Sequence, residues 1–98
     1  MKFRKKPVVI NAAQITEDGA KALYELVDGC PDVDIVRGHA LSDIPNKVIS
    51  VHVRTLEGTM IGNLGDWLIR GVKGEFYPCK SDIFAATYEV ADTEPVNS

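Results

Sequence analysis

The segment from Val48 to Thr55 constrains the fold of this chain most strongly, because apolar and polar side chains alternate along it. Such alternation is typical of a β-strand that buries one face and exposes the other. We expect Ile49, Val51 and Val53 to face the core and the residues between them to face solvent. The segment therefore predicts a half-buried strand of an antiparallel sheet.

Further short strands follow, separated by turns rich in glycine, asparagine and aspartate. Such residues tolerate the unusual backbone angles of tight turns, and Lys73-Gly74 suits a two-residue hairpin turn. The strands are expected at residues 59–61, 67–72 and 75–79. After them, Ser81 is expected to cap a helical turn at 82–86, and residues 87–90 to add an edge strand.

The first third of the chain predicts a strand followed by a helix. Residues 7–15 are apolar on both faces, which is typical of a central strand. Thr16 is expected to cap a helix, which Gly29 and Pro31 end. The helix has one apolar stripe, formed by Ala20, Leu23, Tyr24 and Val27. A short strand at 32–37 and an irregular loop at 38–47 are expected next.

These elements predict an α+β fold. We expect a small, curved, mainly antiparallel sheet with one N-terminal helix packed on it and a short C-terminal helical turn. The length of 98 residues corresponds to one domain, which we place at residues 1–90. Residues 91–98 are polar and acidic, and are expected to form a flexible tail.

Charge is distributed unevenly along the chain, although the formal net charge is only −3. The first six residues are strongly basic, and the rest is acidic. No basic stripe interleaved with aromatic residues continues this arm, which argues against nucleic-acid binding. No apolar run reaches the roughly 20 residues that span a bilayer. The start reads as a strand and not as a signal peptide, so we expect a cytoplasmic protein.

Metal binding and nucleophilic catalysis are weakly supported. Cys30, His39, His52 and Cys79 are zinc-ligand types, but no two have the spacing of a metal motif. Cys79 could act as a nucleophile with Lys80 lowering its pKa, yet no catalytic cysteine signature surrounds it. We therefore expect no metal or other cofactor, and favour a non-enzymatic protein over an enzyme.

The segment from Gly65 to Phe84 is the densest in aromatic and charged residues. One interpretation is that Trp67, Phe76 and Phe84 only pack the hairpin against the helix. The other is that its surface residues bind a ligand or partner, since arginine and lysine grip anions and aromatic rings stack on planar groups. The candidate binding residues are Trp67, Arg70, Lys73, Glu75, Tyr77 and Lys80. Both interpretations can hold together.

Two stretches, MKFRKKPVVI near the start and GDWLIRGVKGEFYPCKSDIF near the end, carry a resemblance. They resemble a family of small phage and prophage proteins of uncharacterised function, which share an RKKPVVIEA-like opening and a GDWIIRGVKGEFYPCKPDIF-like close. The resemblance covers residues 1–13 and 57–89. Asn11 replaces the family's usual acidic residue, and Leu64 and Ser81 stand where proline is common. The resemblance implies a phage or prophage origin and expression in the host cytoplasm.

A shorter stretch, SDIFAATYEV, is similar to the DILADDWEV-like close of phage anti-Thoeris sponge proteins, which sequester a cyclic nucleotide signal. Two functions therefore stand. The first, which we favour, is a non-enzymatic phage accessory protein that binds a host protein during infection. The alternative is a sponge, or an enzyme, for an anionic small molecule such as a nucleotide defence signal. A sheet with a free edge would also suit a homodimer.

Overall fold

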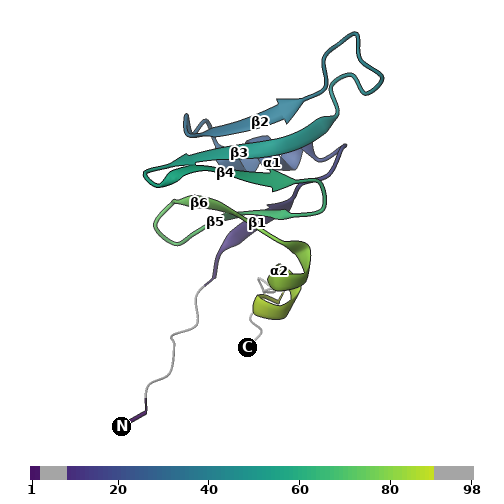
Figure 1. Cartoon of the computed structure of the whole chain (residues 1–98). Helices are drawn as coiled ribbons and strands as arrows, with labels where there is room; N and C mark the ends of the chain where they lie inside the picture. The colour runs from purple at the N-terminus through teal and green to yellow at the C-terminus, as the bar shows by residue number, and fades with distance from the viewer. Residues whose placement is uncertain (3–8, 90–98) are drawn as a thin grey trace.

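The computed structural model describes residues 1–2 and 9–89, which form antiparallel strands with a helix near each end (Figure 1). The strands are β1 (Asn11–Gln14), β2 (Val33–Arg37), β3 (Val48–Thr55), β4 (Gly58–Asn63), β5 (Trp67–Arg70) and β6 (Phe76–Cys79). The helices are α1 (Ala20–Val27) and α2 (Ser81–Thr87). The predicted α+β class is confirmed. The expected tail at 91–98 lies outside the described residues.

The strands form two three-stranded antiparallel sheets, an upper sheet of order β2-β3-β4 and a lower sheet of order β1-β5-β6. The sheets approach each other where Gly62 of β4 lies against Pro78 of β6. A Cβ atom on Gly62 would stand 3.0 Å from the Cβ of Pro78. Proline has no N–H to donate to a neighbouring strand, so β6 cannot continue the ladder through this residue. The antiparallel strands expected from the sequence are thus divided between two sheets.

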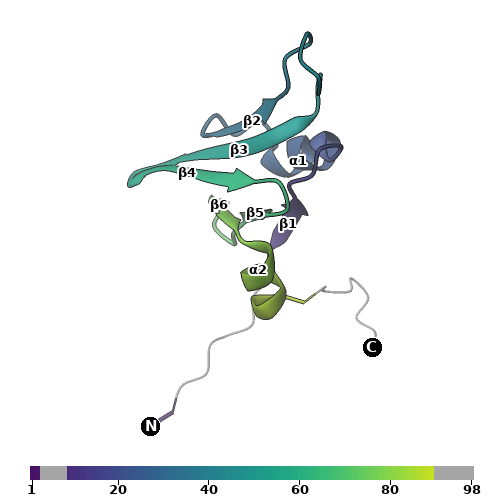
Figure 2. The ribbon, with the colours of Figure 1, turned by 45° about the vertical axis from the view of Figure 1, so that its right-hand side comes forward.

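The hydrophobic core lies between α1 and the strands. Figures 1 and 2 show α1 beside the upper sheet, whereas α2 lies beyond the lower sheet. Leu23 and Val27 of α1 are buried together with Ile15, Val51 and Leu68. The spacing of Leu23 and Val27 by one helical turn explains why this short helix has one core-facing stripe.

The start of α1 differs from the expected cap. Gly19 holds the N-cap position, and no side chain caps the helix. Thr16 instead accepts a hydrogen bond at its carbonyl oxygen from the N–H of Gly19, at 3.1 Å. The prediction that Thr16 caps the helix is therefore wrong, because residues 16–19 form a turn before it. Of the predicted stripe, Tyr24 lies at the margin and is 48% exposed.

Strand β1 is shorter than expected and lies at an edge of the lower sheet, where it pairs with β5. The prediction of a central strand is wrong. Both faces of β1 are apolar although the strand is not central. Ala13 faces the core on one side, and Ala12 lines a cavity beside α2 on the other. Residues 7 and 8 of the predicted strand lie outside the described part of the chain.

Strand β2 and the irregular loop at 38–47 are confirmed. A bulge follows where the loop joins β3. Ser50 pairs with Val36, and Val48 pairs with the next residue of β2, so Ile49 is an extra residue on β3. The bulge interrupts the alternation: Ile49 is 40% exposed and Ser50 only 8% exposed. The sequence pattern was wrong for both side chains, because alternation assumes an unbroken ladder.

The C-terminal helix is longer than the predicted turn. Ser81 is its first residue and not its cap, since Lys80 holds the N-cap position without a side-chain hydrogen bond. Tyr88 follows the helix with extended backbone angles but pairs with none of the strands in the described residues. The predicted edge strand is therefore wrong over residues 87–89, and Val90 lies outside the described residues.

Replacing Gly62 with alanine tests the contact between the sheets. The new methyl group would stand 2.7 Å from the Cδ1 of buried Ile15 and 3.0 Å from Pro78. Overpacking of this kind costs about 1–3 kcal/mol, so we expect the free energy of unfolding to fall by that amount in urea denaturation. Thr59→Ala, at an exposed position of the same strand, is the control and should change it by less than about 0.5 kcal/mol. Equal stability of Gly62→Ala and the parent would contradict the close approach.

Candidate binding cleft

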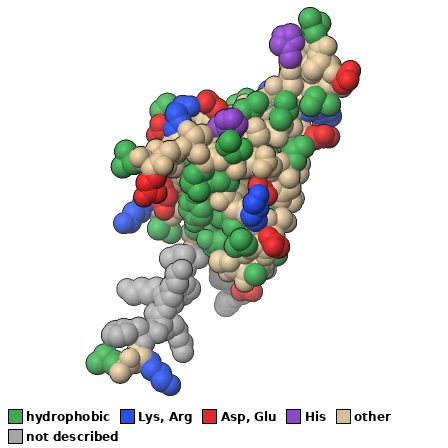
Figure 3. Space-filling view, viewed as in Figure 1, with side chains coloured by type: hydrophobic (Ala, Val, Ile, Leu, Met, Phe, Trp, Pro, Cys, Tyr) green, Lys and Arg blue, Asp and Glu red, His purple; other side chains and the backbone are tan. Residues whose placement is uncertain are grey.

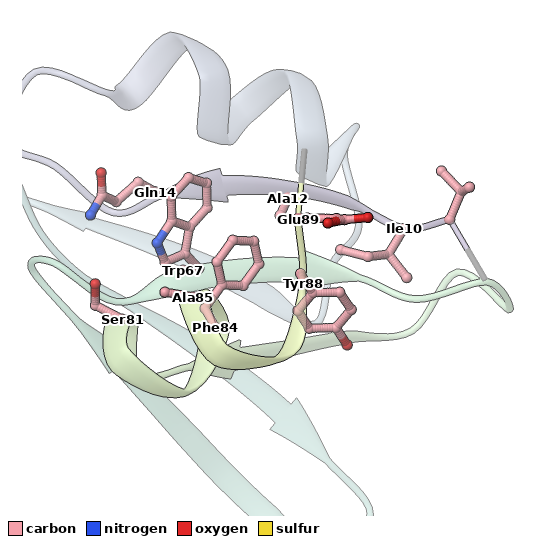
Figure 4. A pocket seen from close by; sticks show the side chains of 10 residues that line it. Ile10, Ala12, Gln14, Trp67, Ser81, Phe84, Ala85, Tyr88 and Glu89 are labelled. Carbon is pink, nitrogen blue, oxygen red and sulfur yellow. The ribbon is translucent and has the colours of Figure 1, made fainter. Parts of the chain in front are cut away.

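A cavity of about 540 Å³ opens between the start of β1, strand β5 and α2 (Figure 4). Its wall is mainly apolar, formed by Ile10, Ala12, Trp67, Phe84, Ala85 and Tyr88. We call this cavity the aromatic cleft. Its volume lies within the range of about 300–1,000 Å³ that is usual for ligand sites. The cleft can therefore hold a group as large as one or two apolar side chains.

Three aromatic rings lie in a row along the cleft (Figure 4). The rings of Trp67 and Phe84 are stacked, with centroids 4.3 Å apart and planes 6° from parallel. The ring of Tyr88 follows at 5.1 Å from that of Phe84, tilted by 33°. Beyond it, the hydroxyl groups of Tyr88 and Tyr77 lie 3.4 Å apart, within hydrogen-bond reach. All four side chains are only partly buried, so the row presents ring surface to the cleft.

Strand β5 positions the first ring of this row. Successive side chains of a strand point to opposite faces, so Trp67 and Ile69 share one face while Leu68 faces the other. Leu68 belongs to the core beneath α1. Ile69 is also fully buried but lies outside that core. Strand β5 is therefore covered on both faces, and the face with Trp67 is the one toward α2.

Helix α2 positions the other two rings. The N–H of Phe84 donates to the carbonyl oxygen of Lys80 at 2.8 Å, and the N–H of Tyr88 donates to that of Phe84 at 2.9 Å. Side chains four residues apart on a helix lie on the same side of it, so Phe84 and Tyr88 both project from the side of α2 that faces the lower sheet. Lys80 alone separates α2 from β6, so the helix must fold back close to the strand.

The polar groups of the cleft are few. Gln14 is already engaged, since its Nε2 donates to the carbonyl oxygen of Gly65 at 3.1 Å. Ser81 and Glu89 complete the lining, and Glu89 is its charged residue in the described part of the chain. Figure 3 shows a band of hydrophobic side chains over the lower half of the molecule, with charged side chains at its margins. The aromatic cleft thus combines an apolar wall with one acidic side chain, that of Glu89, among the described residues.

Of the residues predicted from the sequence, Trp67 and Tyr77 are brought to one face of the lower sheet. Arg70 lies on the opposite face, because it is three residues after Trp67 on the same strand and side chains an odd number of residues apart point to opposite faces. Its partner on β6 is Phe76. Its guanidinium lies 5.9 Å from the Phe76 ring centre. It lines a separate hollow of about 390 Å³ together with Glu25.

The other three predicted residues make local contacts. Glu75 folds over the hairpin turn, where its Oε1 accepts a hydrogen bond from the backbone N–H of Lys73 at 3.0 Å. The ammonium of Lys80 lies 3.7 Å from the carboxylate of Asp66. Asp66 in turn accepts a hydrogen bond from the N–H of Asn63 at 3.0 Å. Glu75 and Lys80 therefore hold turns through their side chains, Lys73 takes part only through its backbone N–H, and none of the three lines the aromatic cleft.

Cys79 lies opposite Trp67 on the neighbouring strand and is partly buried. Burial raises the pKa of its thiol, and the nearby carboxylates of Asp66 and Asp82 raise it further. A raised pKa keeps the thiol protonated at neutral pH, which is the opposite of what a cysteine nucleophile requires. The local charges therefore suit a packed thiol better than a catalytic one.

Sequence reasoning missed Phe84 and Tyr88 as site residues, although it treated Phe84 as a packing residue. The stack with Trp67 shows that Phe84 does pack, against the lower sheet. Phe76 packs instead against the core on the other side. The spacing of Phe84 and Tyr88 by four residues was the available signal, but the predicted helical turn ended at residue 86 and Tyr88 was placed in an edge strand.

Comparison with protein-family models, with curated proteins and with solved structures finds no match for this chain. Within residues 1–2 and 9–89, no three His, Cys, Asp or Glu side chains gather in a way that could hold a metal ion. Neither helix of that part is long and apolar enough to cross a membrane.

The Tyr77–Tyr88 contact predicts a pH dependence of stability. The hydrogen bond with Tyr88, with a contribution from burial, raises the pKa of Tyr77 to about 12. The ordinary value is 10.0, so between these values the folded chain holds a proton that the unfolded chain has lost. The stabilisation is complete below pH 10 and is lost as the pH rises toward 12. Urea unfolding at about pH 9 and about pH 11 should show a larger loss for the parent than for Tyr77→Phe.

Tyr24→Phe is the matched control, since Tyr24 lies on α1 and is about half exposed. It should lose as much stability between the two pH values as the parent does. An identical loss in Tyr77→Phe would contradict the coupling of the two hydroxyl groups.

Proposed function

We propose that this chain is a non-enzymatic phage or prophage accessory protein that binds a host protein through the aromatic cleft. The observation that carries the proposal is the partly exposed row of Trp67, Phe84 and Tyr88 above an apolar wall. Aromatic residues are the ones that most often dominate binding energy at protein interfaces. The phage origin rests on the resemblance of the two terminal stretches.

The lining of the cleft indicates the chemistry of the bound segment. An apolar side chain of the partner would bury against Phe84, Ala85 and Ile10. A lysine or arginine beside it would complement Glu89 and could lie against the ring of Tyr88. The proposed partner segment therefore carries an aromatic or aliphatic residue next to a basic one.

Binding is favoured over catalysis by the state of Cys79, whose pKa is raised by burial and by two carboxylates. The alternative function, a sponge for an anionic small molecule, needs cations that converge on one site. Arg70 lies on the face of the lower sheet away from the aromatic cleft, whereas Lys80 is the N-cap of α2 and lies near Asp66. The carboxylate of Glu89 at the aromatic cleft would also disfavour an anion there.

Site-specific photocrosslinking in the host bacterium tests the proposal. A photoreactive phenylalanine analogue at position 88 stands in the cleft, and the same analogue at position 24 stands on exposed α1. We expect a discrete crosslinked host protein from position 88 and none from position 24. Adding Phe84→Ala to the first variant should reduce the crosslink at least about tenfold, since the loss of a central aromatic contact costs 2 kcal/mol or more.

Thermal unfolding with a panel of anionic nucleotides distinguishes host-protein binding from the alternative, a sponge for an anionic small molecule. A ligand at about 100 times its dissociation constant adds about 2.7 kcal/mol, which is visible as a rise in melting temperature. We expect a flat panel. A rise that Arg70→Ala abolishes, together with no crosslink at position 88, would replace host-protein binding with ligand sequestration.

A further inference from the structure

Strand β4 is an open edge of the upper sheet. It pairs with β3 on one side. On its other side the last residue is already engaged, since the N–H of Asp66 donates to the carbonyl oxygen of Asn63 at 3.0 Å, whereas residues 58–62 have no such backbone partner among the described residues. Five of its six residues are exposed, including Met60 at 42% and Ile61 at 53%. An edge of this kind presents N–H and C=O groups that can pair with a further strand.

The opposite edge of the same sheet is protected. Strand β2 carries Asp34 and Arg37, and its pairing with β3 contains the bulge at Ile49. Charged side chains and bulges are two of the devices by which proteins keep sheet edges from pairing with other chains. In the lower sheet, the β6 edge contains Pro78, which is a third such device.

Strand β4 has none of these devices. Its sequence, Gly-Thr-Met-Ile-Gly-Asn, contains no charged residue and no proline. Met60 and Ile61 leave apolar surface exposed beside this unpaired edge, and a further strand could bury it.

Strand β6 covers only one end of the β4 edge. Gly62 lies against Pro78 there, as the close approach of the two Cβ positions shows. The other end projects beyond the lower sheet as part of the β3–β4 hairpin (Figure 2). Residues 58–61 are therefore the part of the strand that can accept a partner.

We propose that β4 pairs antiparallel with β4 of a second copy of this chain. Pairing about a two-fold axis would satisfy both open edges at once and join two three-stranded sheets into one of six. The neutral strand favours a copy of itself, because no like charges would face each other across the pair. Met60 and Ile61 of each copy would bury against the other.

The dimer would leave the aromatic cleft accessible. The cleft belongs to β1, β5 and α2, while the pairing edge belongs to the upper sheet. Each dimer would therefore present two clefts, and a partner with two suitable segments would gain from binding both. Dimerisation does not depend on the proposed host partner.

Sedimentation equilibrium of the full chain tests the pairing. The chain has a mass of 10.7 kDa, and we expect the mass to rise to twice that value as concentration increases. Ile61→Lys should raise the dissociation constant at least about tenfold, because a charged side chain on the pairing strand is one of the devices that keep sheet edges apart. Thr59→Lys, on the same face of the strand, should do the same.

Leu56→Lys is the matched control, since Leu56 lies in the turn beyond the strand and is fully exposed. It should leave the dissociation constant unchanged if strand pairing holds the dimer. Circular dichroism and thermal unfolding confirm that each variant is folded. A folded chain that stays monomeric up to about millimolar concentration would overturn the proposal, as would a dimer that both Ile61→Lys and Thr59→Lys leave intact.

Discussion

The stack of Trp67 on Phe84 holds α2 against the lower sheet, and the candidate site depends on it. None of the seven residues of α2 is fully buried, so the helix has no core of its own. An isolated helix of this length is unstable in water, because nucleation costs more than so few hydrogen bonds return. Stacked aromatic pairs add about 0.5–1.5 kcal/mol beyond the area that they bury. The formation of α2 therefore depends on the contact between Phe84 and the ring of Trp67.

Strand β5 links this stack to the rest of the fold. Leu68 and Ile69 are both fully buried, although they point to opposite faces. Leu68 packs in the core beneath α1, and Ile69 is buried on the face that also carries Trp67. A strand fixed on both faces gives the aromatic cleft a rigid floor, which favours binding because little has to be ordered when a partner arrives.

Local patterns in the sequence predicted the helix α1 and the strands β2 to β6, but the two-residue turn expected at Lys73-Gly74 was wrong, since β5 ends at Arg70 and β6 begins at Phe76. The helix and the strands could be predicted because each depends on residues close together in the sequence, such as Leu23 and Val27 on one side of α1. The division into two sheets could not be read in this way, because it depends on a long-range contact between Gly62 and Pro78. The bulge at Ile49 could not be predicted for the same reason, because it depends on how β3 pairs with β2.

The candidate site was predicted in part. Trp67 and Tyr77 share a face of the lower sheet, as the interpretation of a binding surface required. Arg70 was grouped with them by its nearness in the sequence, but strand alternation sends it to the other face. Tyr88 was assigned to a strand, and its place in the cleft depends on how α2 folds back over β5.

Hydrogen exchange at the amide of Tyr88 tests the central claim most directly. This N–H donates to the carbonyl oxygen of Phe84, so it is protected only while α2 is formed. Phe84→Ala should speed its exchange at least about tenfold, which corresponds to about 1.4 kcal/mol, while amides of β3 keep their rates. Equal exchange at Tyr88 in the parent and in Phe84→Ala would show that α2 is held by something other than the aromatic stack.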